Sequence, residues 1–155
     1  MDPSTLEALG KAGGAAALGL AAVGSSIGAG VAGAAAIGAW KKCYAQSKAA
    51  PFILITFIGA PLSQTIYGMI LMGWMVDVAK NPELVASTWA TMLIGGIFGG
   101  LGIGVSAWFQ GYAGAAGADA LAETGQGFGN YLMTLGVIET VALFVLVFIR
   151  SSFMS

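Results

Sequence analysis

The chain has 155 residues, of which 57% are hydrophobic and 8% are charged, with no histidine and a formal net charge of −1. Soluble globular proteins carry about 25% charged residues, so this composition excludes an ordinary soluble domain and indicates a membrane protein. The few charges are scattered and nearly balanced, which argues against a nucleic-acid partner. The lone Cys43 excludes an internal disulfide and a cysteine metal site, and we interpret it as a free thiol.

Four long apolar segments follow one another, separated by short polar connections. Each is longer than the roughly 20 helical residues that cross a hydrocarbon core of about 30 Å. The N-terminal MDPSTLEALGK carries acidic residues where a secretory signal carries basic ones, so we expect no cleaved signal. We predict an all-α membrane protein, a single membrane domain over residues 1–155 made of two tandem helical hairpins, with transmembrane helices at 12–40, 52–78, 87–118 and 127–149.

The basic residues do not decide the orientation of this membrane domain. Four spans place both termini and the Asn81 loop on one face, and the loops near Lys41 and Asp119 on the other. Three basic residues lie on each face: Lys41, Lys42 and Lys48 against Lys11, Lys80 and Arg150. The positive-inside rule therefore gives a tie.

Glycine alternates along the four predicted spans. Nine of the 25 glycines lie between Gly10 and Gly38 and nine between Gly95 and Gly117, whereas the second and fourth spans are poor in glycine. The second and fourth spans also align so that Gln64 pairs with Glu139. We interpret this pattern as a weak duplication of one hairpin, in which only the second copy has the carboxylate.

The glycines of the first span predict close helix packing. Small residues let helix backbones approach each other in lipid, where hydrophobicity contributes little to helix association. A helix with small residues on most of its sides suits a position on the inner wall of a ring. The alternative is a single close helix contact in a monomeric bundle. The predicted packing residues are Gly24, Gly28, Gly33 and Gly38, with Gly111 on the third span.

Glu139 is the single acidic residue in the otherwise apolar stretch 129–149. A carboxylate at mid-membrane costs on the order of 3 kcal/mol or more, and by default it marks an ion or proton path. The alternative is a glutamate that serves packing through a hydrogen bond to a neighbouring helix.

Gln64 and Gln110 are predicted to lie at the depth of Glu139. At about 1.5 Å per helical residue, all three lie near 20 Å from the Lys41 and Asp119 face. Pro61 lacks a backbone N–H, which loosens the helix around Ala60 and exposes a carbonyl. Carbonyl, hydroxyl, amide and carboxylate oxygens suit a desolvated Na⁺, and protonation of the carboxylate by H⁺ is the alternative.

At these residues the chain resembles the membrane rotor proteolipid, known as K or c, of V-type (archaeal and bacterial A/V-type) rotary ATPases, in its duplicated-hairpin form. The most specific matches are Pro61-x-x-Gln64-x-x-Tyr67, Gln110-Gly111 and Glu139-Thr140. In the sodium-binding branch, the resemblance implies Na⁺ held by the carbonyl of Ala60, the hydroxyl of Ser63, the amides of Gln64 and Gln110, and Glu139. It implies a hydrogen bond from Tyr67 to the carboxylate. Ala60 and Ser63 stand where that branch often has Leu and Thr.

The resemblance also implies the partners and the setting of the chain. Identical subunits form a ring in membrane lipid, a stator subunit presents an Arg to the unloaded carboxylate, and a central-stalk subunit meets the Lys41 and Asp119 loops on the cytoplasmic side. We expect a prokaryotic cell membrane and no organic cofactor. The sequence has no GxxxxGK phosphate-binding segment, so ATP hydrolysis belongs to other subunits. A secondary transporter and a non-transporting assembly protein are the rival functions.

Overall fold

The computed structural model describes residues 1–154, and within them all regular structure is helical. The elements are α1 (Pro3–Ala45), η1 (Phe52–Leu54), α2 (Ile55–Gly59), η2 (Ala60–Leu62), α3 (Ser63–Ala79), α4 (Pro82–Thr124) and α5 (Phe128–Ser151). The short elements η1, α2 and η2 continue into α3 as one interrupted helix, Phe52–Ala79. Within residues 1–154, four helices are therefore long and apolar enough to cross a membrane.

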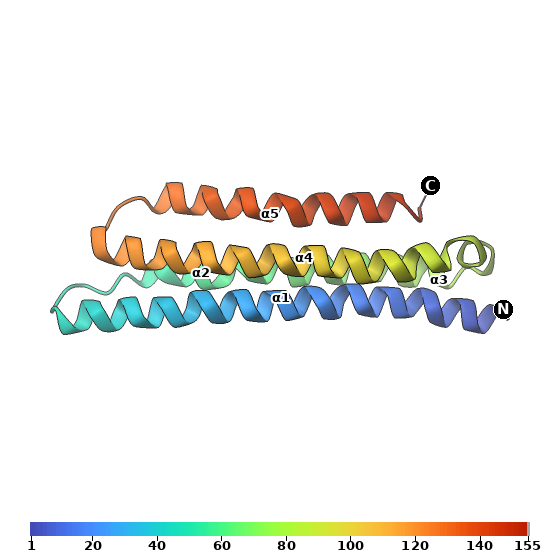
Figure 1. Ribbon diagram of the computed structural model, residues 1–155, viewed down its shortest axis with the longest axis horizontal. Coiled ribbons are helices and arrows are strands. Elements are labelled where there is room, and N and C mark those ends of the chain that lie inside the picture. Colours follow the sequence, from blue (N-terminus) through green and yellow to red (C-terminus); the bar gives the residue numbers. More distant parts are fainter. Residues whose placement is uncertain (155) are drawn as a thin grey trace.

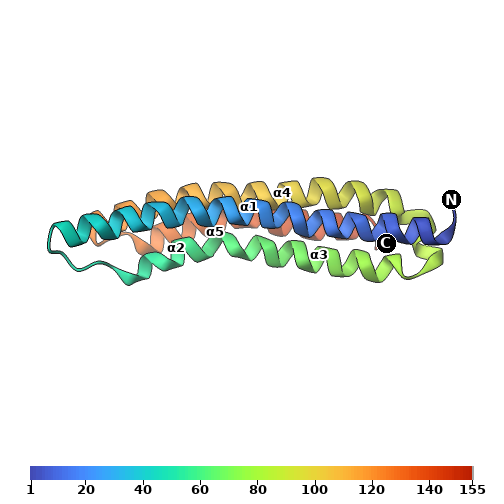
Figure 2. The same ribbon diagram turned by 90° about the horizontal axis from the view of Figure 1, so that it is seen from below.

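The helices lie side by side along one axis and form an elongated bundle (Figures 1 and 2). Both termini lie at one end, together with the turn between α3 and α4, and the other two connections lie at the opposite end (Figure 1). This arrangement confirms the predicted all-α fold of two tandem hairpins. The helices α1 and α4 have 43 residues each. At 1.5 Å per residue each is about 65 Å long, which exceeds the hydrocarbon core.

The predicted spans 12–40, 52–78 and 87–118 lie inside α1, the interrupted helix and α4, and all three helices continue past them. The predicted span 127–149 begins one residue before α5. The positions at which the bilayer begins and ends along these helices stay a prediction.

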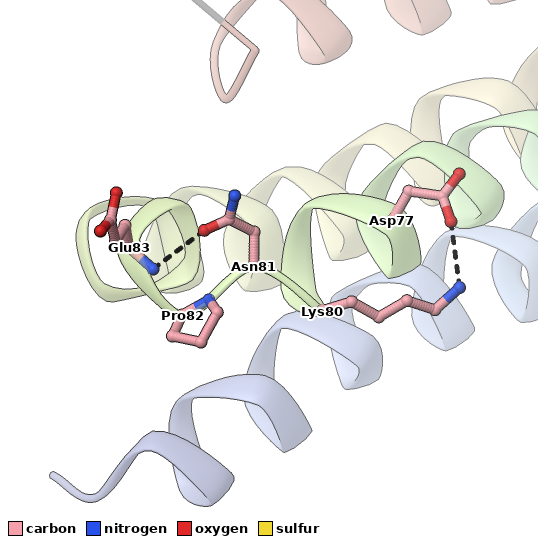
Figure 3. A pocket seen from close by; sticks show the side chains of 5 residues that line it. All are labelled: Asp77, Lys80, Asn81, Pro82 and Glu83. Atoms are coloured by element: carbon pink, nitrogen blue, oxygen red, sulfur yellow. Dashed lines mark hydrogen bonds and ion pairs between the residues drawn. The ribbon is translucent and has the colours of Figure 1, made fainter.

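Local chemistry sets the ends of the two long helices. Asp2 caps α1 by accepting the Thr5 N–H at 2.9 Å. Asn81 caps α4 by accepting the Glu83 N–H at 3.0 Å, as Figure 3 shows. A proline follows each cap at the first helical position, where its missing N–H leaves no helical bond unmade. At the other end of α4, Gly125 adopts a φ of +68°, which ends the helix.

The helices α1 and α4 run parallel and touch along a glycine seam. We define this seam by the glycines at which an added Cβ would overlap the facing backbone: Gly13, Gly24 and Gly28 on α1, and Gly96, Gly100, Gly104 and Gly111 on α4. Gly24 meets Gly104, and Gly28 meets both Ala107 and Gly111. The backbones therefore make direct contact, as small residues permit in lipid.

Two of the glycines predicted to pack have little or no contact within the chain. An added Cβ at Gly33 would meet only the Ile58 side chain at 3.8 Å, and one at Gly38 would meet nothing within 4 Å. The close packing predicted at Gly24, Gly28 and Gly111 is present in the seam, whereas the side of α1 at Gly38 is open to its surroundings.

The interrupted helix and α5 both pack beside the seam. Two buried apolar clusters contain residues of both helices. Toward the termini, Leu71 of α3 and Ala142 of α5 belong to one buried cluster. Toward the opposite end, Phe57 of α2 and Leu135 of α5 belong to another. The level between these clusters contains Glu139.

Candidate ion-binding site

Pro61 shapes the first part of the site. Because proline has no N–H to continue the α-helix, the chain makes a 3₁₀ turn over Ala60–Leu62. The carbonyl of Ala60 then accepts the Ser63 backbone N–H and lies 3.0 Å from the Ser63 hydroxyl oxygen. The turn thus places a main-chain oxygen and a hydroxyl next to each other at the level of Glu139.

Ser63 also lies close to the amide oxygen of Gln64. The distance from Ser63 Oγ to Gln64 Oε1 is 3.1 Å. A hydroxyl has a single proton, so Ser63 can donate to either Ala60 O or Gln64 Oε1 but to both only by sharing. Three oxygen atoms with spare lone pairs therefore face one another in this turn.

Gln64 and Gln110 join the interrupted helix to α4. Gln64 Nε2 donates to Gln110 Oε1 at 2.8 Å, and both side chains are fully buried. Gln110 Nε2 donates in turn to the Leu135 carbonyl of α5 at 3.0 Å. Buried amides of this kind need hydrogen bonds, because an unpaired one is costly in an apolar interior. These bonds fix the direction of both amide oxygens.

Glu139 completes the chain of polar contacts. Tyr67 OH donates to Glu139 Oε1 at 2.5 Å, and Gln110 Nε2 lies 3.4 Å from Glu139 Oε2. One connected path therefore contains every predicted ion ligand and the predicted carboxylate partner: Ala60, Ser63, Gln64, Gln110, Glu139 and Tyr67. The structure brings these six residues together, and their role toward an ion stays a prediction.

The charge of Glu139 has no basic partner within residues 1–154. The ion pairs in that part of the chain join Glu7 to Lys11, Asp119 to Lys42 and Asp77 to Lys80, all near helix ends. Within the same residues, no three His, Cys, Asp or Glu side chains group together. The site therefore offers one negative charge and several neutral oxygens.

Ser106 belongs to the surroundings of the site, and sequence reasoning missed it. Its hydroxyl donates to the Ile138 carbonyl at 2.9 Å and ties α4 to α5 beside Glu139. Ser106 precedes Gln110 by four residues, so both lie on one helix face. This four-residue spacing from Gln110 is the feature of the sequence that could have indicated Ser106. Thr140, by contrast, bonds to Val137 of its own helix.

Several hollows lie on the surface of the bundle, and two of them show where the site lies relative to the surface. One, of about 600 Å³, lies at the turn between α3 and α4 and is lined by Asp77, Lys80, Asn81, Pro82 and Glu83 (Figure 3). Asp77 comes 13 residues after Gln64, about 20 Å along the helix, so this hollow is separate from the ion-site level. The second, of about 570 Å³, is an apolar groove between α4 and α5 lined by Leu101, Gly102, Val105, Ser106, Phe109, Val137, Ile138 and Val141.

Comparison with protein families gives a match in the second half of the chain. Residues 93–149 match the family model of the C subunit of ATP synthase, a membrane proteolipid family whose members form oligomeric rings and translocate ions without a catalytic site of their own. The matched residues lie in the second hairpin and include Gln110 and Glu139. A search of curated proteins finds no match. The match and the four apolar helices support an integral, multi-pass membrane protein.

Proposed function

We propose that this chain is the rotor-ring proteolipid, K or c, of a V-type rotary ATPase and that each copy carries one Na⁺ on Glu139. The observation that carries the proposal is a carboxylate inside an apolar helix, hydrogen-bonded by Tyr67 and Gln110 and without a basic partner in residues 1–154. The match of residues 93–149 to the C subunit of ATP synthase supports it.

The oxygen atoms around Ser63 favour Na⁺ over H⁺ as the cargo. Ala60 O and Gln64 Oε1 lie 3.0 and 3.1 Å from Ser63 Oγ, with one hydroxyl proton between them. A small hard cation would be shared by all three oxygens and by the amide oxygen of Gln110. A proton binds to the carboxylate alone, so these neutral oxygen atoms would not be needed as ligands.

Charge neutrality explains how such a site would work in a turning ring. A carboxylate with one bound monovalent cation is neutral and can face lipid, whereas the ionised, empty carboxylate cannot. The emptied Glu139 therefore has to meet a positive group, which we assign to an Arg of a stator subunit. Each ion that crosses 100 mV exchanges about 2.3 kcal/mol, so a ring that pools several ions can couple them to one ATP.

The surface of the single chain is consistent with identical neighbours. Glu139, Ser63 and Tyr67 are only partly buried, although Gln64 and Gln110 are fully buried. The apolar groove between α4 and α5 opens beside Glu139. A neighbouring copy seated in this groove would exclude water from the carboxylate and close the site.

Carbodiimide labelling tests the proposed function. In membranes that contain the whole complex, we expect dicyclohexylcarbodiimide to modify Glu139 and Na⁺ to slow the reaction, when NaCl is compared with KCl at neutral pH. Mass spectrometry of the full chain locates the modified residue. The variant Gln110→Ala loses a ligand, and we expect it to need about tenfold more Na⁺ for half-protection. Gln126→Ala, an exposed glutamine in the loop before α5, is the matched control.

Each result decides between the candidate functions. Labelling at Glu139 without protection by Na⁺ would make H⁺ the cargo. An assembly protein, in which Glu139 serves packing alone, should show no ion-dependent protection of any kind. A secondary transporter should be protected by its organic substrate instead of by the cation alone.

A further inference from the structure

Ser25 of α1 has a buried hydroxyl without a hydrogen-bond partner. The side chain is 2% exposed, and within residues 1–154 its Oγ is the one buried side-chain nitrogen or oxygen atom left unpaired. A polar group left in this state destabilises the fold, because it has lost its hydrogen bonds to water and gained none in return. The adjacent Ser26 is exposed and donates to the Ala22 carbonyl of its own helix at 2.9 Å. Of the two adjacent serines, only the buried Ser25 is therefore without a hydrogen-bond partner.

The helix contacts around Ser25 show which turn it faces. Ala21 lies one helical turn earlier and packs against Gly68 of α3, whereas Gly28 lies three residues later and packs against Pro61. Residues at these spacings share one helix face. Ser25 consequently lies on the face of α1 that packs against residues 61–68, and this segment contains Gln64.

Gln64 has an unused donor on the same interface. Its amide nitrogen carries two protons. One is donated to Gln110 Oε1, and no second hydrogen bond from this nitrogen is present within residues 1–154. Gln64 is fully buried, so water from outside the bundle does not satisfy the remaining N–H. A spare buried donor on α3 and a spare buried hydroxyl on α1 therefore belong to the same contact between two helices.

We propose that Ser25 is a positioning residue for the ion site: its hydroxyl accepts the second N–H of Gln64, directly or through one buried water, when Gln64 Oε1 holds the cation. A cation on the amide oxygen polarises the amide and strengthens the hydrogen bonds that its N–H groups donate. The bond also holds Gln64 Oε1 toward Ala60 and Ser63. This inference rests on the proposed function and adds α1 to the helices that determine its ion affinity.

The test compares Ser25→Ala with Ser26→Ala in the assembled ring. The measured quantity is the Na⁺ concentration that half-protects Glu139 from dicyclohexylcarbodiimide at fixed pH. We expect Ser25→Ala to raise this concentration about threefold to tenfold, because one hydrogen bond is lost. Ser26→Ala should leave it unchanged. Ser25→Gly, which also removes the hydroxyl, should repeat the result of Ser25→Ala.

The outcomes separate a positioning role from a structural one. A half-protecting concentration equal to that of the wild type in both Ser25 variants would overturn the inference, and so would a loss of ring thermal stability with unchanged Na⁺ protection. Failure of both variants to assemble would show that the hydroxyl serves folding, which also overturns it. A wild-type chain without Na⁺ protection refutes the proposed function, whereas a protected wild type with an unchanged Ser25→Ala refutes only the inference about Ser25.

Discussion

At the scale of single residues, Glu139 is surrounded by hydrogen-bond donors that carry no positive charge. Tyr67 and Gln110 each direct a proton toward one carboxylate oxygen, and neither can neutralise it. Asp119, at a helix end, instead has Lys42 3.8 Å away, and both of those side chains are largely exposed. Such surface pairs contribute little to stability. Glu139 is thus a carboxylate placed among apolar residues without a basic partner in residues 1–154, which suits the proposed exchange of a bound cation.

The substitution Glu139→Gln tests whether transport depends on the negative charge of residue 139 and not only on its hydrogen bonds. Glutamine has nearly the same shape and no charge, so it can still accept the Tyr67 hydroxyl proton but cannot neutralise a cation. We expect rings to assemble normally and ATP-driven Na⁺ uptake into vesicles to fall to background. Glu123→Gln is the control, because Glu123 is an exposed carboxylate at the end of α4. Normal Na⁺ uptake by Glu139→Gln would remove the residue from the transport path.

Asp2 gives a pH-dependent prediction away from the ion site. Hydrogen bonds from the Ser4 hydroxyl and from the backbone and side chain of Thr5 lower the pKa of Asp2 from 3.8 to about 2. Because the folded-state pKa is the lower one, the cap contributes fully above about pH 4 and is lost as the pH falls through about 2. Amide exchange at Thr5 should accelerate over that range. Asp2→Asn keeps a capping oxygen that does not titrate, and the same acceleration in this variant would contradict the explanation.

At the scale of helices, glycine and proline decide which helix is central and which is interrupted. The seam puts the backbones of α1 and α4 in contact. In α5, by contrast, only 17% of the most apolar stretch of 18 residues is buried. Pro61 interrupts the helix at the level of the proposed ion site. The two devices act together, since the added Cβ at Gly28 would also meet Pro61.

A Cβ in the seam should destabilise the bundle. Gly24→Ala would push a methyl group into the backbone of Gly104, so α1 and α4 must separate. Overpacking of this kind costs about 1–3 kcal/mol, which we expect to appear as a lower midpoint in thermal unfolding of the purified chain in detergent. Gly73→Ala, at an exposed position of α3 with nothing within 4 Å, should be neutral or slightly stabilising. Equal midpoints for the two variants would argue against a close seam.

At the scale of the whole molecule, the single chain leaves much of its apolar surface uncovered. Large apolar side chains along α5 are exposed, among them Val137, Val141, Phe144 and Phe148. Lipid or a second copy can cover such a surface, and the partly exposed site beside the groove favours a second copy for that part of it. The proposed ring also accounts for the open glycines of α1, such as Gly38, on the side away from the seam.

The order of apolar segments along the sequence was enough to predict the four helices and the common level of Gln64, Gln110 and Glu139. Both depend only on residue counts, since helix rise is constant. The hydrogen bonds of Gln110 to Leu135 and of Ser106 to Ile138 could not be predicted in this way. They depend on how each helix is rotated about its axis, and that rotation is set by the seam. The same rotation leaves Gly33 and Gly38 outside the seam.

A high-resolution density map of the ring purified in NaCl would test the central claim most directly. The proposal predicts a ring of identical chains with a density peak enclosed by the oxygen atoms of Ala60, Ser63, Gln64, Gln110 and Glu139, absent when the ring is prepared without Na⁺. A map in which these oxygens enclose no peak, or in which Glu139 pairs with a basic residue of its own chain, would contradict it.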